Sequence, residues 1–134
     1  RVVRALEIYR VSGKTKTELD RLCAEPDPTF CPYVVGLLWD RGELNRRIDA
    51  RVEQMLSAGL LEETRQLLAA GVFDTNATAA QAIGYKELLS YLRGGEPLAD
   101  AVERLKCATR QYAKRQMTWF RAKPYVRWVD AGTV

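Results

Sequence analysis

The apolar stretch YVVGLLW at residues 33–39 decides the fold class of this chain. Three prolines lie within residues 26–32, directly before it, and proline excludes a regular helix or a central strand there. A short continuous apolar run behind such a breaker is typical of a strand buried inside an α/β sheet. Asp40 and Glu43 follow the run and predict the N-terminus of a helix. The sequence therefore predicts an α/β fold built around a strand at 33–39.

Most of the remaining chain has helical patterns. Apolar residues recur at helical spacing over 2–11, and Thr15 with Glu18 has the form of a capping box. Gly84 lies inside the helical pattern at 81–92, where a glycine costs about 1 kcal/mol relative to alanine. The predicted helices cover 2–11, 15–22, 43–57, 61–70, 81–92 and 98–123, a polar connection covers 71–78, and a last strand covers 125–129.

The composition excludes several classes of protein. The 134 residues suit one ordinary domain, and a hydrophobic fraction of 47% excludes a disordered chain. No run approaches the roughly 18 apolar residues of a membrane-spanning helix, so we expect no membrane partner. The absence of histidine removes histidine-based triads and the usual zinc ligand sets. Because no CxxC spacing occurs, we expect Cys23, Cys31 and Cys107 to be reduced thiols of a cytoplasmic protein.

The basic residues are concentrated near the C-terminus. The net charge is +4, but residues 104–127 hold eight basic residues and no acidic residue. On a wheel of the predicted helix 98–123, one face collects apolar residues and the adjacent face collects cations. Such a row of cations either fits the phosphates of a nucleic acid or is a solvated face without a partner. The apolar face contains Leu98, Ala101, Val102, Leu105, Ala108, Tyr112, Trp119 and Phe120, and the basic face contains Lys106, Arg110, Lys114 and Arg121 beside Met117.

Two arginines flank the apolar stripe of the helix predicted at 43–57. A wheel places Arg47 and Arg51 directly beside the stripe, and this position predicts partial desolvation. A desolvated guanidinium requires an anionic partner. The partner is either a carboxylate elsewhere in the fold, or a phosphate or diphosphate, which a guanidinium binds through two parallel hydrogen bonds. The wheel alone leaves both possibilities open.

Two further segments suggest contacts to phosphate or nucleotide. The sequence SGKT at 12–15 has the form of the end of a P-loop, but Ile8 stands where the motif requires glycine, and the segment follows a helix. We therefore reject it as a phosphate site. In the segment 81–86, a glycine, an aromatic ring and a cation meet at the start of a helix. They indicate either a close helix crossing at Gly84 with Tyr85 in the core, or a contact to an unpaired base and its phosphate.

Four blocks of the sequence resemble the bacterial tRNA dimethylallyltransferases, also called tRNA isopentenyltransferases. The blocks follow one another in the family's order and at about its spacing, across nearly the whole chain. The segment 114–121 is the most specific part. The blocks are RVVRALEIYR at 1–10, LNRRIDARV at 44–52, QAIGYKEL at 81–88 and YAKRQMTWFR at 112–121.

The resemblance implies an activity. The family transfers a dimethylallyl group from dimethylallyl diphosphate to the exocyclic amine of the adenosine 3′ of the anticodon, with Mg²⁺. It implies a cytoplasmic enzyme, monomeric at full length, whose partners are the tRNA anticodon stem-loop and dimethylallyl diphosphate. A non-catalytic RNA-binding helical module, or a structural fragment without a partner, would be the alternatives.

The resemblance also implies a domain organisation. The family has a P-loop-type α/β core with a helical insertion domain. This sequence starts without methionine, and we expect it to be the C-terminal part of a longer protein. Residues 1–25 are then the tail of the insertion domain, 26–32 a proline-rich linker, and 33–134 the C-terminal part of the core. The phosphate loop, the catalytic base and the Mg²⁺ ligands are expected upstream, so the chain alone is expected to be inactive.

Site residues are carried over from the matching blocks. Arg47 is expected to bind the diphosphate leaving group, with Arg51 as the substitute, and no metal ligand is expected in this chain. The expected tRNA contacts are Arg1, Arg4, Gln81, Ala82, Ile83, Gly84, Tyr85, Lys86, Lys114, Arg115, Gln116, Met117, Thr118, Trp119, Phe120 and Arg121.

Overall fold

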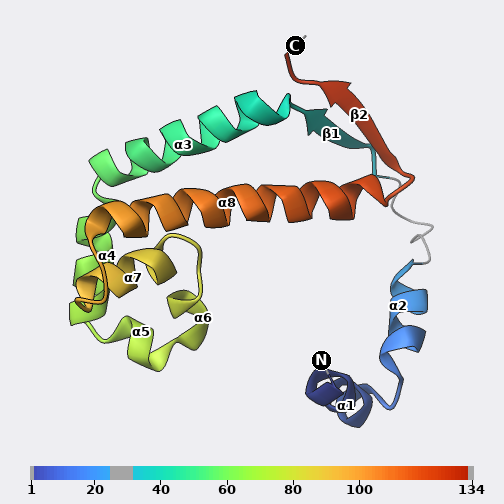
Figure 1. Cartoon of the computed structure of the whole chain (residues 1–134). Coiled ribbons are helices and arrows are strands. Elements are labelled where there is room, and N and C mark those ends of the chain that lie inside the picture. Colours follow the sequence, from blue (N-terminus) through green and yellow to red (C-terminus); the bar gives the residue numbers. More distant parts are fainter. Residues whose placement is uncertain (1, 25–31, 133–134) are drawn as a thin grey trace. The chain divides into compact units, whose positions relative to one another are not determined.

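The computed structural model describes residues 2–24 and 32–132 (Figure 1). Within these ranges the chain is mostly helical with a small parallel sheet, which confirms the predicted fold class. The chain divides into two compact units, Arg1–Val34 and Val35–Val134. The elements are α1 (Val2–Ser12), α2 (Lys16–Ala24), β1 (Val34–Leu38), α3 (Arg41–Ser57), α4 (Leu60–Ala69), α5 (Val72–Thr75), α6 (Ala77–Ala80), α7 (Tyr85–Leu92), α8 (Leu98–Arg121) and β2 (Val126–Asp130).

The first unit contains α1 and α2, which confirm the sequence prediction. α1 ends where the amide of Gly13, at a φ of 67°, donates to the Tyr9 carbonyl at 2.8 Å. The predicted capping box opens α2: the Thr15 amide donates to Glu18 Oε2 at 2.7 Å, and the Glu18 amide donates to Thr15 Oγ1 at 3.3 Å. Most of the linker predicted at 26–32 lies outside the described residues, and the proposed division into insertion domain and core stays a prediction.

β1 and β2 pair in parallel, because the pairing advances along both strands together. Gly36 lies against Trp128, and the Ala131 amide donates to the Leu38 carbonyl at 2.8 Å. A Cβ at position 36 would stand 2.6 Å from the Trp128 ring, so the ring can lie there only over a glycine. The strands predicted at 33–39 and 125–129 are thus confirmed as elements.

The predicted burial of the first strand is wrong on one face. Exposure alternates along β1, and Val35 and Leu37 are 48% and 56% exposed. Successive side chains of a strand point to opposite faces of the sheet. The face that carries Val35 and Leu37 is open within the part of the chain that the structure describes, whereas Val126 is buried.

Helices α3 and α8 lie side by side and lead toward the sheet (Figure 1). Asp40 begins α3 as predicted, because its Oδ1 accepts from the amides of Gly42 at 2.9 Å and Glu43 at 3.0 Å. These hydrogen bonds, with that from Glu43 the largest cause, lower the pKa of the Asp40 carboxyl. The buried apolar residues are Ile48, Val52, Phe73, Leu88, Leu89, Ala101, Leu105 and Val126.

The cluster of α4, α5, α6 and α7 lies at the end of α8 away from the sheet (Figure 1). The polar connection predicted at 71–78 is wrong, because α5 and the start of α6 occupy it and Phe73 is buried there. The helix predicted at 81–92 begins only at Tyr85. Gly84 precedes it with a φ of 108°, a conformation that favours glycine, and its amide donates to Glu87 Oε2 at 3.0 Å.

The long helix α8 confirms the predicted element but ends two residues earlier, at Arg121. Its first half packs as predicted, with Ala101 and Leu105 buried. Tyr112 and Trp119, assigned to the same apolar face, are 47% and 54% exposed, so that prediction is wrong for the second half. The helical cluster covers only the first half of α8 (Figure 1), which explains the difference. No described helix is both long and apolar enough to cross a membrane.

Candidate functional site

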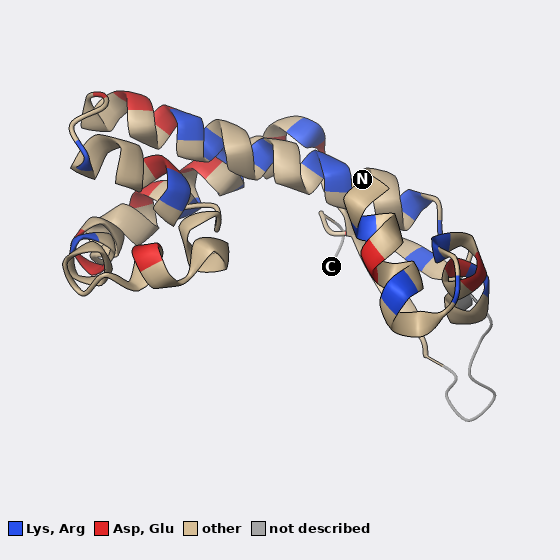
Figure 2. Cartoon of the chain, turned by 90° about the horizontal axis from the view of Figure 1, so that it is seen from below, with Lys and Arg blue, Asp and Glu red and all other residues tan. Residues whose placement is uncertain are grey.

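The basic residues in the first half of α8 are neutralised by carboxylates. Figure 2 shows acidic residues near the start of this helix and basic residues along the rest. Lys106 Nζ lies 2.7 Å from Glu53 of α3, and Arg110 Nη2 lies 2.7 Å from Asp49 of α3. Lys106 and Arg110, which the helix wheel placed on the basic face but which lie outside the matching block 112–121, therefore form structural ion pairs between α3 and α8. A wheel of one helix cannot reveal them, because the partner carboxylates belong to another helix.

These ion pairs predict a loss of stability when they are removed. Lys106 is only 14% exposed, and the hydrogen bond to Glu53 is the largest cause of the raised pKa of its ammonium. Replacing Lys106 and Arg110 by Gln is expected to lower the Tm by about 2–4 °C, since each partly exposed pair contributes up to about 1 kcal/mol. An unchanged Tm in thermal unfolding would contradict the structural role.

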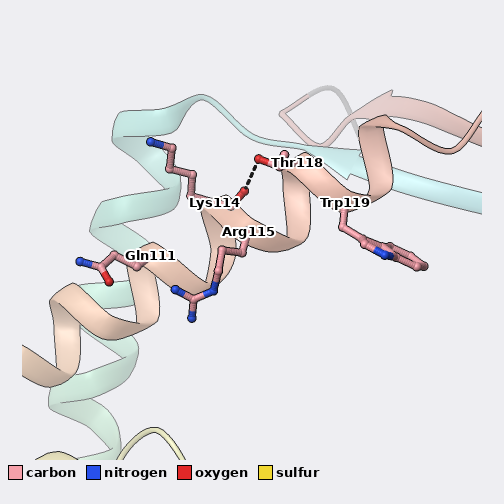
Figure 3. A pocket seen from close by; sticks show the side chains of 5 residues that line it. All are labelled: Gln111, Lys114, Arg115, Thr118 and Trp119. Carbon is pink, nitrogen blue, oxygen red and sulfur yellow. Dashed lines mark hydrogen bonds between the residues drawn. The ribbon is translucent and has the colours of Figure 1, made fainter. Parts of the chain in front are cut away.

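The second half of α8 presents cations without carboxylate partners. Among the described residues, Lys114, Arg115 and Arg121 form no ion pair. A shallow hollow on this helix is lined by Gln111, Lys114, Arg115, Thr118 and Trp119. In Figure 3, Arg115 and Trp119 extend from one side of the helix and Lys114 from the opposite side. Four of the five lining residues belong to the segment 114–121, while Gln111 was missed and lies one turn before it.

Aromatic rings accompany these cations. Arg115 lies over the Tyr112 ring at 5.8 Å, and Lys123 lies over the Trp119 ring at 4.6 Å. Trp119 also meets the Phe120 ring edge-on at 4.7 Å. Exposed rings beside unpaired cations are the combination with which proteins hold RNA bases and phosphates.

The segment 81–86 divides into a structural part and an open part. The Tyr85 hydroxyl donates to Glu63 Oε1 at 2.5 Å, and its ring lies 5.5 Å from the Phe73 ring. The bond to Glu63 is the largest cause of the raised pKa of Tyr85. The Tyr85 ring therefore packs in the fold, as the core interpretation held, and the predicted stacking on a base loses its support.

The close helix crossing at Gly84, which the core interpretation also included, is not observed. A Cβ at that position would meet no heavy atom within 4 Å among the described residues, so the glycine is needed for its φ and not for a crossing. Lys86, which is exposed and forms no ion pair in the described ranges, lines a second hollow with Gln81. Arg93 lines the same hollow; it lies outside the matching blocks, and sequence reasoning missed it. Ala82 and Ile83 are exposed beside them.

The predicted desolvation of Arg47 and Arg51 is wrong. Both are exposed, and the Arg47 side chain is 56% exposed, because the helix presents this edge of its apolar stripe to an uncovered side. Arg47 Nε donates to Glu43 Oε1 at 2.9 Å, so its carboxylate partner is on the same helix. Its guanidinium carbon lies 3.8 Å from the centroid of the Trp39 ring. Arg51 forms no ion pair with a described residue.

The N-terminal residues give less support to a site. Arg1 lies outside the described residues, and Arg4 pairs with Glu7 of its own helix at 3.1 Å. The segment 12–15 begins at the last residue of α1, and the Ser12 hydroxyl donates to the Ile8 carbonyl at 2.7 Å, consistent with its rejection as a P-loop. Within the described ranges, no three Cys, Asp or Glu side chains are grouped closely enough to hold a metal ion.

The chain thus combines an α/β segment with a half-helix whose cations form no ion pair within the described residues and whose aromatic rings are exposed. A sequence model described as IPP transferase matches residues 1–123. The chain belongs to this family.

Two curated relatives share the name tRNA dimethylallyltransferase. A tRNA dimethylallyltransferase of Pelotomaculum thermopropionicum is 47% identical over 129 residues, which cover 96% of this chain and 40% of the relative. A tRNA dimethylallyltransferase of Bacillus velezensis is 48% identical over 130 residues, with 97% and 40% covered. The chain therefore spans about 40% of the length of these relatives.

Solved structures agree with the sequence relatives. A tRNA isopentenylpyrophosphate transferase from Staphylococcus epidermidis superposes with a TM-score of 0.75 at 36% identity, covering 99% of this chain and 43% of that one. A eukaryotic dimethylallyltransferase acting on tRNA superposes with a TM-score of 0.69 at 33% identity, with 96% and 34% covered. The resemblance seen in the sequence blocks is confirmed.

Proposed function

We propose that this chain is part of a tRNA dimethylallyltransferase and supplies tRNA contacts and a diphosphate-binding arginine to it. The main support for the proposal is that the basic residues differ between the two halves of α8. Carboxylates neutralise Lys106 and Arg110 in its first half, whereas Lys114, Arg115 and Arg121 form no ion pair within the described ranges. Unpaired cations beside exposed rings support an RNA-facing surface. Family membership supports the reaction class.

The reaction needs an electrophile held by cations. The exocyclic amine nitrogen of adenosine forms a bond to the allylic carbon, the bond from that carbon to the diphosphate oxygen breaks, and the amine loses a proton to a base. Negative charge develops on the leaving diphosphate, so a positioned guanidinium lowers the barrier. Arg47 is proposed for this role, with Arg51 as the substitute. The substrate is proposed to be dimethylallyl diphosphate.

The RNA surface is proposed to have several parts. The segment 114–121 of α8 approaches the anticodon stem-loop, and Gln81 and Lys86 add a second contact through the hollow they line. Arg1 and Arg4 are the proposed contacts from the N-terminal unit. The complete enzyme is proposed to act as a monomer in the cytoplasm.

Mg²⁺ is proposed to be required by the complete enzyme. Its ligands are proposed to lie outside this chain, as the family resemblance implies.

The salt dependence of RNA binding tests the proposed surface. Replacing Lys114 and Arg121 by Gln in the complete protein removes two charges that form no ion pair in the described part of the fold. If each neutralises about one phosphate, the slope of log K against log salt becomes shallower by about two units. The Tm stays close to that of the unchanged protein, because exposed charges contribute little to stability.

The matched control removes two charges elsewhere. Arg46 and Arg65 are exposed and are ion-paired with Glu43 and Glu62 on their own helices. Replacing both by Gln changes the net charge equally, and we expect the salt slope to stay within about half a unit of the unchanged protein. Equal slopes for the two double variants would make the second half of α8 a solvated face and contradict the proposal.

A further inference from the structure

Arg47 is held on two sides by residues that the sequence blocks do not assign. The Trp39 ring covers one face of its guanidinium, with the carbon 3.8 Å from the ring centroid. Glu43 Oε1 accepts from its Nε at 2.9 Å. A cation over a tryptophan face is attracted by the ring quadrupole, and a charge-assisted hydrogen bond fixes the edge of the guanidinium. Together these contacts set the direction of a side chain that is otherwise exposed.

The two contacts leave the far end of the guanidinium available. Arginine carries five N–H donors, one on Nε and four on the Nη atoms. Glu43 occupies the Nε donor, and the Trp39 ring occupies a face but no donor. The Nη atoms of Arg47 have no hydrogen-bond partner in the described part of the chain. Parallel N–H groups of this kind match two oxygens of a phosphate group.

Glu43 also binds a second arginine. Glu43 binds Arg46 through its other oxygen, with Arg46 Nη2 and Glu43 Oε2 2.6 Å apart. One carboxylate therefore serves two guanidinium groups, so Arg47 shares its ion-pair partner with Arg46.

The place in the fold is also suitable for a ligand. Trp39 directly follows β1, and Asp40 begins α3, so the arginine is fixed beside the carboxyl end of a parallel strand. Ligands of α/β sheets bind outside the carboxyl ends of the strands.

We propose that Trp39 and Glu43 are positioning residues that orient the Nη donors of Arg47 toward the diphosphate leaving group. The inference rests on the proposed function, because it deepens the role given to Arg47. A guanidinium that is oriented before the reaction loses less conformational freedom when charge develops on the diphosphate. Trp39 packs against one face of the guanidinium, and Glu43 accepts a hydrogen bond at its edge. Neither residue contacts the substrate.

Variants of Trp39 in the complete protein distinguish a role in orienting Arg47 from a role in folding. Trp39→Met removes the ring but keeps a long apolar side chain, and we expect kcat to fall about 5- to 10-fold with an unchanged KM for the stem-loop. Trp39→Phe keeps a ring face and is expected to restore most of the rate. Inorganic diphosphate should inhibit the Met variant more weakly by a similar factor. Tyr33→Met, just before the other end of β1, is the matched control and leaves kcat unchanged.

A double-mutant cycle tests whether Trp39 and Glu43 act through Arg47. In the Arg47→Ala background, Trp39→Met and Glu43→Gln are expected to cause no further loss of kcat, because the group they orient is gone. Full additivity with Arg47→Ala, or a normal kcat for Trp39→Met, overturns the positioning role while leaving the proposed function intact. A normal kcat for Arg47→Ala overturns the assignment of Arg47 and the positioning role with it.

Discussion

The 134 residues alone, supplied with labelled dimethylallyl diphosphate, Mg²⁺ and an unmodified anticodon stem-loop, are expected to transfer no label above background. The chain contains no GxxxxGK[ST] motif, since Ile8 stands where the SGKT segment would need glycine, and its matching blocks offer no evident general base. The RNA is separated from unreacted dimethylallyl diphosphate, and the label that remains bound to the RNA is measured. The complete protein, assayed in parallel, is the positive control.

Turnover by the 134 residues would contradict this prediction. It would place the base and the phosphate-binding groups within this chain, and the proposed division of the site between this chain and further residues would be wrong.

Arg47→Ala in the complete protein is expected to lower kcat about 100-fold while tRNA affinity stays nearly unchanged. Removing one group that stabilises developing charge typically costs about 3 kcal/mol in the transition state. Steady-state kinetics and a separate binding measurement with the stem-loop distinguish the two effects. Arg65→Ala is the control, because Arg65 is exposed on α4 and paired with Glu62 there.

Two other results would each change the assignment. Normal kinetics for Arg47→Ala with a slow Arg51→Ala variant would move the diphosphate contact to Arg51. A lower Tm in both variants with normal kcat would make both arginines structural, and the carboxylate interpretation of the helix wheel would be sufficient.

Local signals in the sequence predicted the elements well. The capping box of Thr15 and Glu18 and the N-cap Asp40 each involve residues two or three apart, so the pattern contains both partners. The strand at 33–39 was visible because a proline-rich segment isolates it. Its exposed face was not, since a continuous apolar run does not reveal which faces of a sheet other elements cover.

Long-range contacts account for the errors. The wheel of α8 treated Lys106 and Arg110 as equal to Lys114 and Arg121, but Glu53 and Asp49 of another helix neutralise the first two. Similarly, the buried ring of Phe73 anchors a short helical turn in a segment whose composition predicted a connection. Such contacts depend on tertiary packing, and the hydrophobic pattern of one helix cannot predict them.

For the same reason, the sequence predicted only part of the candidate site. The sequence blocks pointed to Arg47, yet its expected desolvation was wrong and its two neighbours were missed. Glu43 could have been found from its position four residues before Arg47, a spacing that favours ion pairs on a helix. Trp39 could not, because its contact depends on how β1 leads into α3.

The most direct test of the proposed function compares two anticodon stem-loops that differ only at the adenosine 3′ of the anticodon. The complete protein is incubated with each, dimethylallyl diphosphate and Mg²⁺, and the digested nucleosides are analysed by mass spectrometry. We predict that the adenosine stem-loop gains one dimethylallyl group on its exocyclic amine and that a guanosine-substituted stem-loop gains none. Binding of both stem-loops without transfer to either would contradict the account and identify a non-catalytic RNA-binding protein.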